Sequence, residues 1–401
     1  MISSLRFSNF YSFAQETRLD FSVGKQPTPS GFDIDLSTAR LNKVVAVVGA
    51  NGSGKTQLIK PLAFLGWFIC DSFLQGDPDQ DIAYQPHRLQ AEQDTHLQID
   101  FFLQGIEHRY QLVLNAGQVV SEVLLNRTST QFSYLFRRER TAEGFSFKQK
   151  GLPFPKAQAQ SLRGNCSLLA AAHSYDIKEA RPFIEFFRHI ISNVASHGRH
   201  HFQRGALVSA AELYEQSPTV KTRMVAAMRE FDLGLSDVVI RPLEVPTADG
   251  KESTVYMPFG LHHSQAGQTF ELSLFEESSG TQSAFVLLER LLTTLELGGM
   301  AVIDEIDNDL HPHLMPKILD WFRFEHSNPH QAQLIFTCHT PEVLNRLQKH
   351  QVYLCEKHDQ CSTAWRFDEV VGLRADDNLY AKYMAGALGA VLAQSDDAAA
   401  A

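Results

Sequence analysis

The chain has 401 residues, of which 44% are hydrophobic and 20% are charged, so it can bury a sizeable core. Its formal net charge of −10 argues against a generally basic surface, and any contact with nucleic acid would need a local patch. No stretch approaches the roughly 20 apolar residues of a membrane-spanning helix. The five cysteines are scattered, without zinc-binding spacing. We therefore expect a globular protein of the reducing cytoplasm with no membrane segment.

The first 150 residues are predicted to form strands around one long helix. Alternating apolar residues predict two strands within 1–23, separated by a corner at 9–13. The β-branched run 44–48 predicts a strand that is buried on both faces, and helical spacing follows over 57–71. Alternation over 96–127 predicts an antiparallel meander.

The periodicity becomes helical after residue 156, with helices predicted over 177–196, 206–216 and 220–231. No heptad array is long enough for a coiled-coil arm. Strand patterns return at 238–243 and 270–275, and helices and strands alternate over 284–367. These changes predict two head lobes, 1–150 and 235–401, with a helical subdomain inserted at 151–234.

A glycine-rich motif lies between the predicted buried strand and the long helix. It fits G-x-x-x-x-G-K-S/T and comprises Gly49, Ala50, Asn51, Gly52, Ser53, Gly54, Lys55 and Thr56, with Gln57 next. The glycines let backbone N–H groups surround phosphate oxygens, and the helix N-terminus adds partial positive charge. We expect this segment to bind ATP, with Lys55 bridging the β- and γ-phosphates and Thr56 holding Mg²⁺.

An acidic pair follows the apolar run 300–303 at the predicted end of a buried strand. Asp304 could hold the hydration shell of Mg²⁺, and Glu305 could polarise the attacking water. A solvated pair of acids is the alternative interpretation. The phosphate loop elsewhere in the chain favours the catalytic one.

Two further segments complete a recognisable order. Ser278, Gly280 and Thr281 precede a predicted helix, where a serine can simply be a helix cap. The apolar run 333–338 ends at His339, which could be a core histidine. The order of phosphate loop, serine-glycine helix start, strand with Asp-Glu and strand with His matches the order of parts in ABC ATPases.

With these parts the chain resembles the small ABC-head ATPases related to RecF, SMC and the overcoming-lysogenization-defect proteins, which are bacterial AAA-type ATP-binding proteins. The likeness covers nearly the whole chain and includes 7–13, 304–312, 336–340, 356–357 and 382–386. It implies an α/β fold with an ABC-ATPase head of the P-loop NTPase type. This head would have a mixed sheet, an antiparallel β subdomain and an inserted helical subdomain.

The resemblance also implies roles for single residues. Ser278, Gly280 and Thr281 would be signature residues that reach the γ-phosphate of ATP held by a partner subunit, and His339 would be the switch histidine. The signature reads Ser-Ser-Gly-Thr here, whereas transporters have Ser-Gly-Gly-Gln.

Three more residues are assigned by the same resemblance. Asn308 and Asp309 would face the opposing site. Gln85 is the candidate for the glutamine that senses Mg²⁺.

These features predict an ATPase that converts ATP and water to ADP and phosphate. It would form a nucleotide-sandwich homodimer, or a higher homo-oligomer. The implied role is the sensor of an anti-phage defence system that controls a separate effector, a nuclease or toxin from a neighbouring gene. One alternative is a RecF- or SMC-like DNA-repair ATPase that clamps DNA, which would predict a basic stripe or long arms. Another is a module that holds ATP without turnover, against which Glu305 argues.

Two short basic clusters, 132–140 and 197–204, are the candidate contacts with nucleic acid. Clusters of this length are also common on ordinary solvated surfaces. The histidines of the second cluster have no Cys or carboxylate partner at metal-binding spacing, so we expect no metal there.

Overall fold

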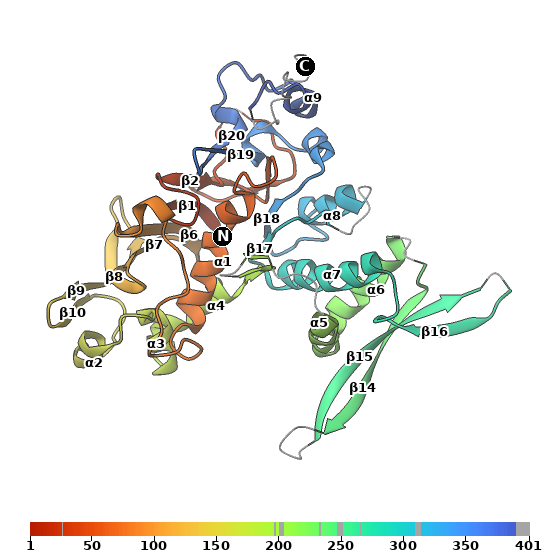
Figure 1. Ribbon diagram of the computed structural model, residues 1–401, viewed down its shortest axis with the longest axis horizontal. Helices are drawn as coiled ribbons and strands as arrows, with labels where there is room; N and C mark the ends of the chain where they lie inside the picture. The colour runs from red at the N-terminus through yellow and green to blue at the C-terminus, as the bar shows by residue number, and fades with distance from the viewer. Residues whose placement is uncertain are drawn as a thin grey trace, which may run out of the picture.

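The computed structural model describes residues 1–25, 27–195, 198–199, 204–231, 234–246, 252–264, 266–308 and 314–389. Two large sheets lie on either side of a long helix, α1, and further helices cover the outer face of one sheet (Figure 1). Asp309 and most of the basic cluster 197–204 lie outside the described residues. No helix within the described ranges is long and apolar enough to cross a bilayer.

The central sheet has six strands in the order β11-β17-β18-β5-β19-β20, all parallel except β20. Its strands are β5 Val44–Gly49, β11 Ile190–Ser192, β17 Met300–Ile303, β18 Gln333–Thr337, β19 Val352–His358 and β20 Cys361–Arg366. Side chains alternate across β5, with Val45 and Val47 in the core on the α1 side and Ala46 in the core on the other side. The predicted strand with two buried faces is therefore confirmed.

The second sheet is antiparallel, with seven strands in the order β10-β9-β8-β7-β6-β1-β2. Its strands are β1 Ile2–Ser8, β2 Thr17–Asp20, β6 Thr95–Leu103, β7 Ile106–Asn115, β8 Gln118–Arg127, β9 Ser133–Thr141 and β10 Gly144–Gln149. The meander predicted over 96–127 is confirmed as β6, β7 and β8, and it continues through two further strands, β9 and β10. Together the two sheets form the α/β head with its antiparallel β subdomain.

Nine helices are present in the described part of the chain. They are α1 Lys55–Asp71, α2 Lys156–Ser161, α3 Leu168–Ser174, α4 Arg181–Arg188, α5 Arg204–Gln216, α6 Pro218–Glu230, α7 Ser279–Leu297, α8 Leu314–Arg323 and α9 Leu379–Met384. Short 3₁₀ turns occupy η1 Arg88–Gln90, η2 Lys178–Ala180, η3 Pro341–Arg346, η4 Lys349–Gln351 and η5 Phe367–Glu369. Helix α1 packs against the central sheet on one face, whereas α5, α6, α7 and α8 contribute to the core on the other.

The predicted helix over 177–196 is wrong beyond Arg188, where α4 ends. The next residues form β11 and pair in parallel with β17 at the edge of the central sheet. Ile190 and Ile191 are β-branched and suit a strand, and the sheet supplies the hydrogen bonds that a helix would otherwise make. This edge strand brings Asn193 to the end of β17.

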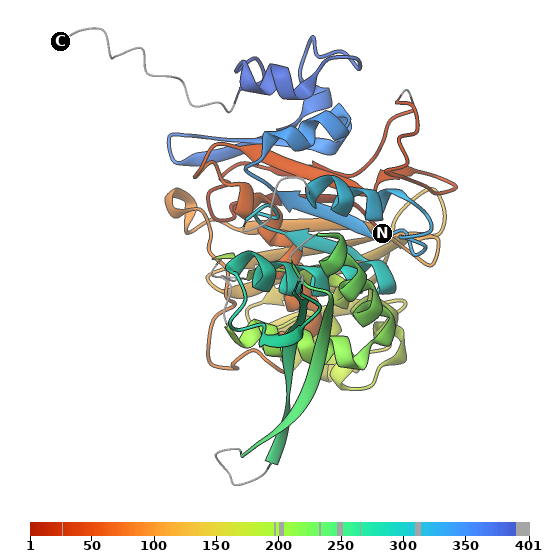
Figure 2. The same ribbon diagram turned by 90° about the vertical axis from the view of Figure 1, so that its right-hand side faces the viewer.

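A three-stranded antiparallel sheet extends away from the rest of the molecule in both views (Figures 1 and 2). Its strands are β14 Asp237–Pro246, β15 Glu252–His263 and β16 Thr269–Ser273, and the remaining short pairs are β3 Asp33–Asp35 with β4 Arg40–Asn42 and β12 Val194–Ala195 with β13 Gly198–Arg199. His262 of β15 lies 2.6 Å from a carboxylate oxygen of Glu277. This contact joins the projecting sheet to the start of α7.

The first basic cluster is not a continuous surface patch. Arg138 is fully buried, and its guanidinium donates to Glu122 Oε2 at 2.8 Å. Arg137 is exposed and lies 3.6 Å from Glu139. Strand alternation sends these neighbouring arginines to opposite faces, so only part of the cluster could meet a ligand.

Candidate nucleotide site

The glycine-rich loop runs from the end of β5 to the start of α1. Gly49, Gly52 and Gly54 all have positive φ, at 150°, 76° and 108°. A Cβ atom on Gly49 would lie 2.3 Å from the Cys355 carbonyl oxygen, and one on Gly54 would lie 2.4 Å from Ser362 Oγ. Glycine is therefore required at both ends of the loop, by conformation and by space.

Lys55, the first residue of α1, is buried and folds back over the loop. Its Nζ donates to the carbonyl oxygens of Gly49 at 2.9 Å and Ala50 at 3.2 Å. Burial lowers the pKa of Lys55 below its usual value. A phosphate oxygen would be a stronger partner for this ammonium group than a neutral carbonyl.

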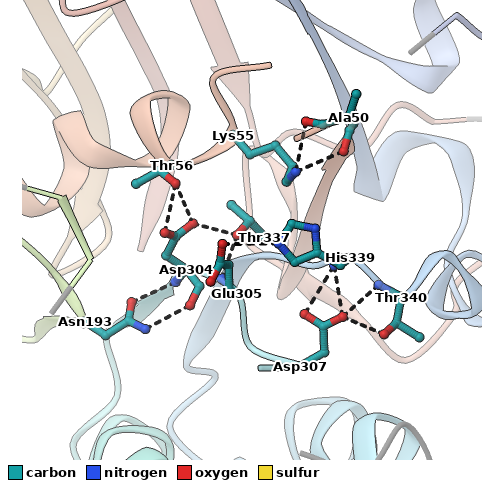
Figure 3. Close-up of polar contacts among 11 residues, drawn as sticks. Ala50, Lys55, Thr56, Asn193, Asp304, Glu305, Asp307, Thr337, His339 and Thr340 are labelled. Carbon is teal, nitrogen blue, oxygen red and sulfur yellow. Dashed lines mark hydrogen bonds and ion pairs between the residues drawn. The ribbon is translucent and has the colours of Figure 1, made fainter. Parts of the chain in front are cut away.

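Asp304 directly follows β17, and alternation along that strand turns its side chain toward α1. Thr56 Oγ1 donates to both of its carboxylate oxygens, at 3.0 and 2.8 Å, and Thr337 Oγ1 donates to Oδ1 at 2.6 Å (Figure 3). The side-chain amide of Asn193 donates to the backbone carbonyl oxygen of Asp304 at 2.9 Å and accepts from the Asp304 N–H at 2.7 Å. A hydroxyl beside a carboxylate is a donor set that suits Mg²⁺.

Glu305 has a left-handed backbone with φ 48°, a conformation that costs a non-glycine residue about 1–3 kcal/mol. Its N–H donates to Thr337 Oγ1 at 2.7 Å, so one hydroxyl contacts both acidic residues. The Glu305 carboxylate lies 3.2 Å from His339 Nε2, and both side chains are partly exposed. The strained residue thus carries its carboxylate into the open part of the site.

His339 is positioned through its backbone by Asp307. The Asp307 carboxylate accepts from the N–H of His339 at 2.9 Å, the N–H of Thr340 at 2.7 Å and the Thr340 hydroxyl at 2.5 Å. These contacts join the segment after β17 to the segment after β18. They fix the histidine beside Glu305.

These side chains surround one cavity of about 270 Å³. Its lining residues are Asn51, Gly52, Gly54, Lys55, Thr56, Gln57, Asp304, Glu305, His339 and Lys357. The loop, the acidic pair and the histidine predicted from the sequence are therefore brought together at the carboxyl ends of three parallel strands. Ligands of open α/β sheets bind at such an edge.

A family model described as "AAA domain, putative AbiEii toxin, Type IV TA system" matches residues 44–345. The chain belongs to this family. The match begins at the first residue of β5 and includes the loop, the acidic pair and His339.

Three solved structures resemble this AAA-domain chain. An SMC head bound to the C-terminal winged-helix domain of ScpA is 12% identical, with a TM-score of 0.46 and 91% of this chain and 97% of that chain covered. An SMC head from Thermotoga maritima is 13% identical, with a TM-score of 0.38 and coverages of 91% and 98%. An SMC head with an extended coiled coil, bound to the C-terminal domain of ScpA derived from Pyrococcus furiosus, is 12% identical, with a TM-score of 0.40 and coverages of 91% and 96%. No curated protein matches the chain.

The residues predicted to form the signature, Ser278, Gly280 and Thr281, lie outside the cavity of their own chain. Ser278 caps α7, accepting a hydrogen bond from the Thr281 N–H at 3.2 Å, and Gly280 lies in the first turn. None of the three is among the residues that line the cavity. Gln85 is exposed and is also absent from the lining of the cavity. Its backbone carbonyl oxygen accepts a hydrogen bond from the Tyr11 N–H at 2.8 Å.

Sequence reasoning assigned no role to Asn193, Thr337, Asp307, Thr340 or Lys357. Asn193 is 111 residues from Asp304, and no local pattern connects them. Thr337 lies two residues before His339, and Thr340 follows it directly. Hydroxyl side chains this close to a candidate site histidine were a signal that the sequence offered. Asp307 lies two residues after Glu305 and could have been read as part of the acidic segment.

Proposed function

We propose that this chain binds ATP with Mg²⁺ and hydrolyses it at a site completed by a second copy of the chain. The observation that carries the proposal is the convergence of Lys55, the Thr56–Asp304 pair and the Glu305–His339 pair on one cavity. Membership of an AAA-domain family supports a nucleotide as the ligand. The proposed units are the lobes 1–150 and 235–401 with the insertion 151–234.

Within one subunit, the backbone N–H groups of residues 49–57 surround the phosphates, and Lys55 exchanges its two carbonyl partners for phosphate oxygens. Thr56 and Asp304 would hold Mg²⁺, which supplies charge compensation to the phosphates. Glu305 accepts a proton from the attacking water. His339 holds the Glu305 carboxylate in place.

The start of α7 acts on the nucleotide of the other subunit. Ser278, Gly280 and Thr281 lie at a helix N-terminus, where the partial positive charge of the helix favours a phosphate. They do not line the cavity of their own chain. A second copy of the chain would therefore complete each site. Because ATP would then contact both subunits, ATP binding should favour the dimer.

We also propose that ATP-dependent closure controls a separate effector, a nuclease or toxin from a neighbouring gene, in a cytoplasmic anti-phage defence system. The description of the family, which includes a putative AbiEii toxin, supports this setting. Co-purification of the chain with the product of the adjacent gene tests it. Binding that differs between ATP and ADP supports control by the nucleotide, whereas a gene neighbourhood of recombination genes without such an effector contradicts it.

The direct test of the nucleotide site is Lys55→Ala. Loss of the buried ammonium leaves phosphate charge that neutral backbone amides cannot balance, so we expect binding of a fluorescent ATP analogue to be abolished. Unchanged affinity would show that the loop is not the nucleotide site. Lys148→Ala, at an exposed lysine of β10, is the matched control and should bind like the wild type.

A further inference from the structure

Lys357 lines two cavities that flank the glycine-rich loop. The first is the 270 Å³ cavity that contains Lys55 and Glu305. The second, of about 420 Å³, lies between loop residues 50–53 and the β19–β20 hairpin. Asn51 and Gly52 also line both cavities, so Lys357 stands beside the exposed middle of the loop.

The sheet topology places Lys357 there. Strand β19 pairs in parallel with β5, and Cys355 lies opposite Gly49, the first residue of the loop. Tyr353 and Cys355 belong to the core on the α1 side, so alternation puts Lys357 on that side as well. Its backbone is therefore set by the same strand pairing that sets the loop.

The β19–β20 hairpin, which carries Lys357, ends in a tight turn and packs against the glycine-rich loop. Its two turn residues, Asp359 and Gln360, have φ of 46° and 66°, as a tight primed turn requires. The hydroxyl groups of Ser362, in β20, and Ser12 share a hydrogen bond of 2.7 Å. The Ser362 side chain also packs directly against Gly54. The hairpin and the loop therefore contact each other at both ends of the loop.

Within the described part of the chain, the charge on Lys357 has no partner. Its neighbours Glu356 and His358 pair with each other at 3.1 Å. The exposed Lys357 ammonium makes no hydrogen bond, ion pair or aromatic contact with any residue that the structure describes. By contrast, Lys55 already donates to two carbonyl oxygens.

We propose that Lys357 is a second phosphate-binding cation, which contacts the terminal phosphates of the nucleotide in the cavity that it lines together with Lys55. This inference rests on the proposed nucleotide site. The cavity is lined by the carboxylates Asp304 and Glu305, and a triphosphate adds more negative charge to it. Lys357 can offset that charge without breaking an existing pair, because it has none among the described residues.

The test compares Lys357→Ala with the wild type for binding of fluorescent ATP, ADP and AMP analogues. We expect ATP affinity to fall roughly 10-fold, since a charge-assisted hydrogen bond is lost at a partly exposed site. The loss should be smaller for ADP and absent for AMP. Lys357→Arg should restore binding, and the exposed Lys148→Ala should bind all three like the wild type.

The outcomes separate this inference from the proposed function. Equal losses for ATP and AMP, or ATP affinity as high as that of Lys148→Ala, would overturn the role of Lys357 while the site stands. A wild-type protein that binds no ATP would overturn both. Lys357 is exposed, so thermal unfolding of the variant should match the wild type and exclude misfolding as the cause.

Discussion

At the scale of single residues, the two adjacent acids of the site have different surroundings. Asp304 is buried and receives hydroxyl hydrogen bonds from Thr56 and Thr337. Glu305 is one residue further along, partly exposed and held in a left-handed conformation. The first environment suits a group that holds a metal, and the second suits a group that exchanges a proton with water.

This difference predicts distinct effects for two conservative changes. Glu305→Gln keeps the shape but cannot accept a proton, so single-turnover phosphate release should slow by about 10²–10⁴-fold while ATP affinity is unchanged. Asp304→Asn should weaken Mg²⁺-dependent ATP binding as well. Wild-type turnover by Glu305→Gln would require another base, and the proposed mechanism would be withdrawn.

His350, in η4, should make stability depend on pH. It is 1% exposed, and burial lowers its pKa from 6.5 to about 4. The unfolded chain therefore binds more protons between these values, so this contribution to stability is full above pH 6.5 and is lost as the pH falls toward 4.

His350→Leu removes this titration. Between pH 7 and pH 5 the wild type should lose on the order of 1–2 kcal/mol of unfolding free energy more than the variant, measured by urea denaturation. The exposed His96→Gln should keep the wild-type pH dependence. Parallel curves for the wild type and His350→Leu would contradict the prediction.

At the scale of elements, a buried carboxylate joins the antiparallel sheet to α3. Glu122 of β8 accepts from Tyr110 Oη at 2.9 Å, Ser167 Oγ at 2.8 Å and the Leu168 N–H at 2.9 Å. Arg138 of β9 completes the set at 2.8 Å, and both charged side chains are fully buried. The short α3 thus begins at a side chain supplied by the sheet.

Breaking this pair should be costly because it leaves an isolated buried charge. Arg138→Met should lower the unfolding free energy by about 3–5 kcal/mol, and adding Glu122→Gln should recover part of the loss. Arg137→Met, at the exposed pair with Glu139, should cost less than about 1 kcal/mol. Equal costs for the two arginine changes in urea denaturation would mean that burial does not control this interaction.

At the scale of the whole molecule, the proposed dimer depends on the N-terminus of α7. Ser278→Arg places a bulky cation where the partner's nucleotide would lie, and Ser278 does not line its own cavity. In a Glu305→Gln background, light scattering should show an ATP-dependent dimer that Ser278→Arg abolishes while ATP binding persists. Ala142→Arg, in the turn between β9 and β10, should still dimerise. A Ser278→Arg dimer would rule out this surface.

Features that depend on neighbouring residues could be predicted from the amino-acid sequence alone. The glycine-rich loop is eight consecutive residues between a β-branched run and a helix, so its position and conformation follow from local chemistry. The meander follows from period-two alternation, and the acidic pair from its place after an apolar run. Each of these features can be predicted because the sequence pattern and the structure that it specifies span the same short segment.

Contacts between residues far apart along the chain depend instead on the three-dimensional fold. It made residues 190–192 an edge strand, because pairing with β17 outweighed the local helical pattern. It brought Asn193 to Asp304 and set Lys357 beside the loop through the parallel pairing of β19 with β5. It also buried Arg138 within a cluster that is basic in sequence. These outcomes depend on strand order and register, which join segments far apart along the chain and leave no periodic signal within any one of them.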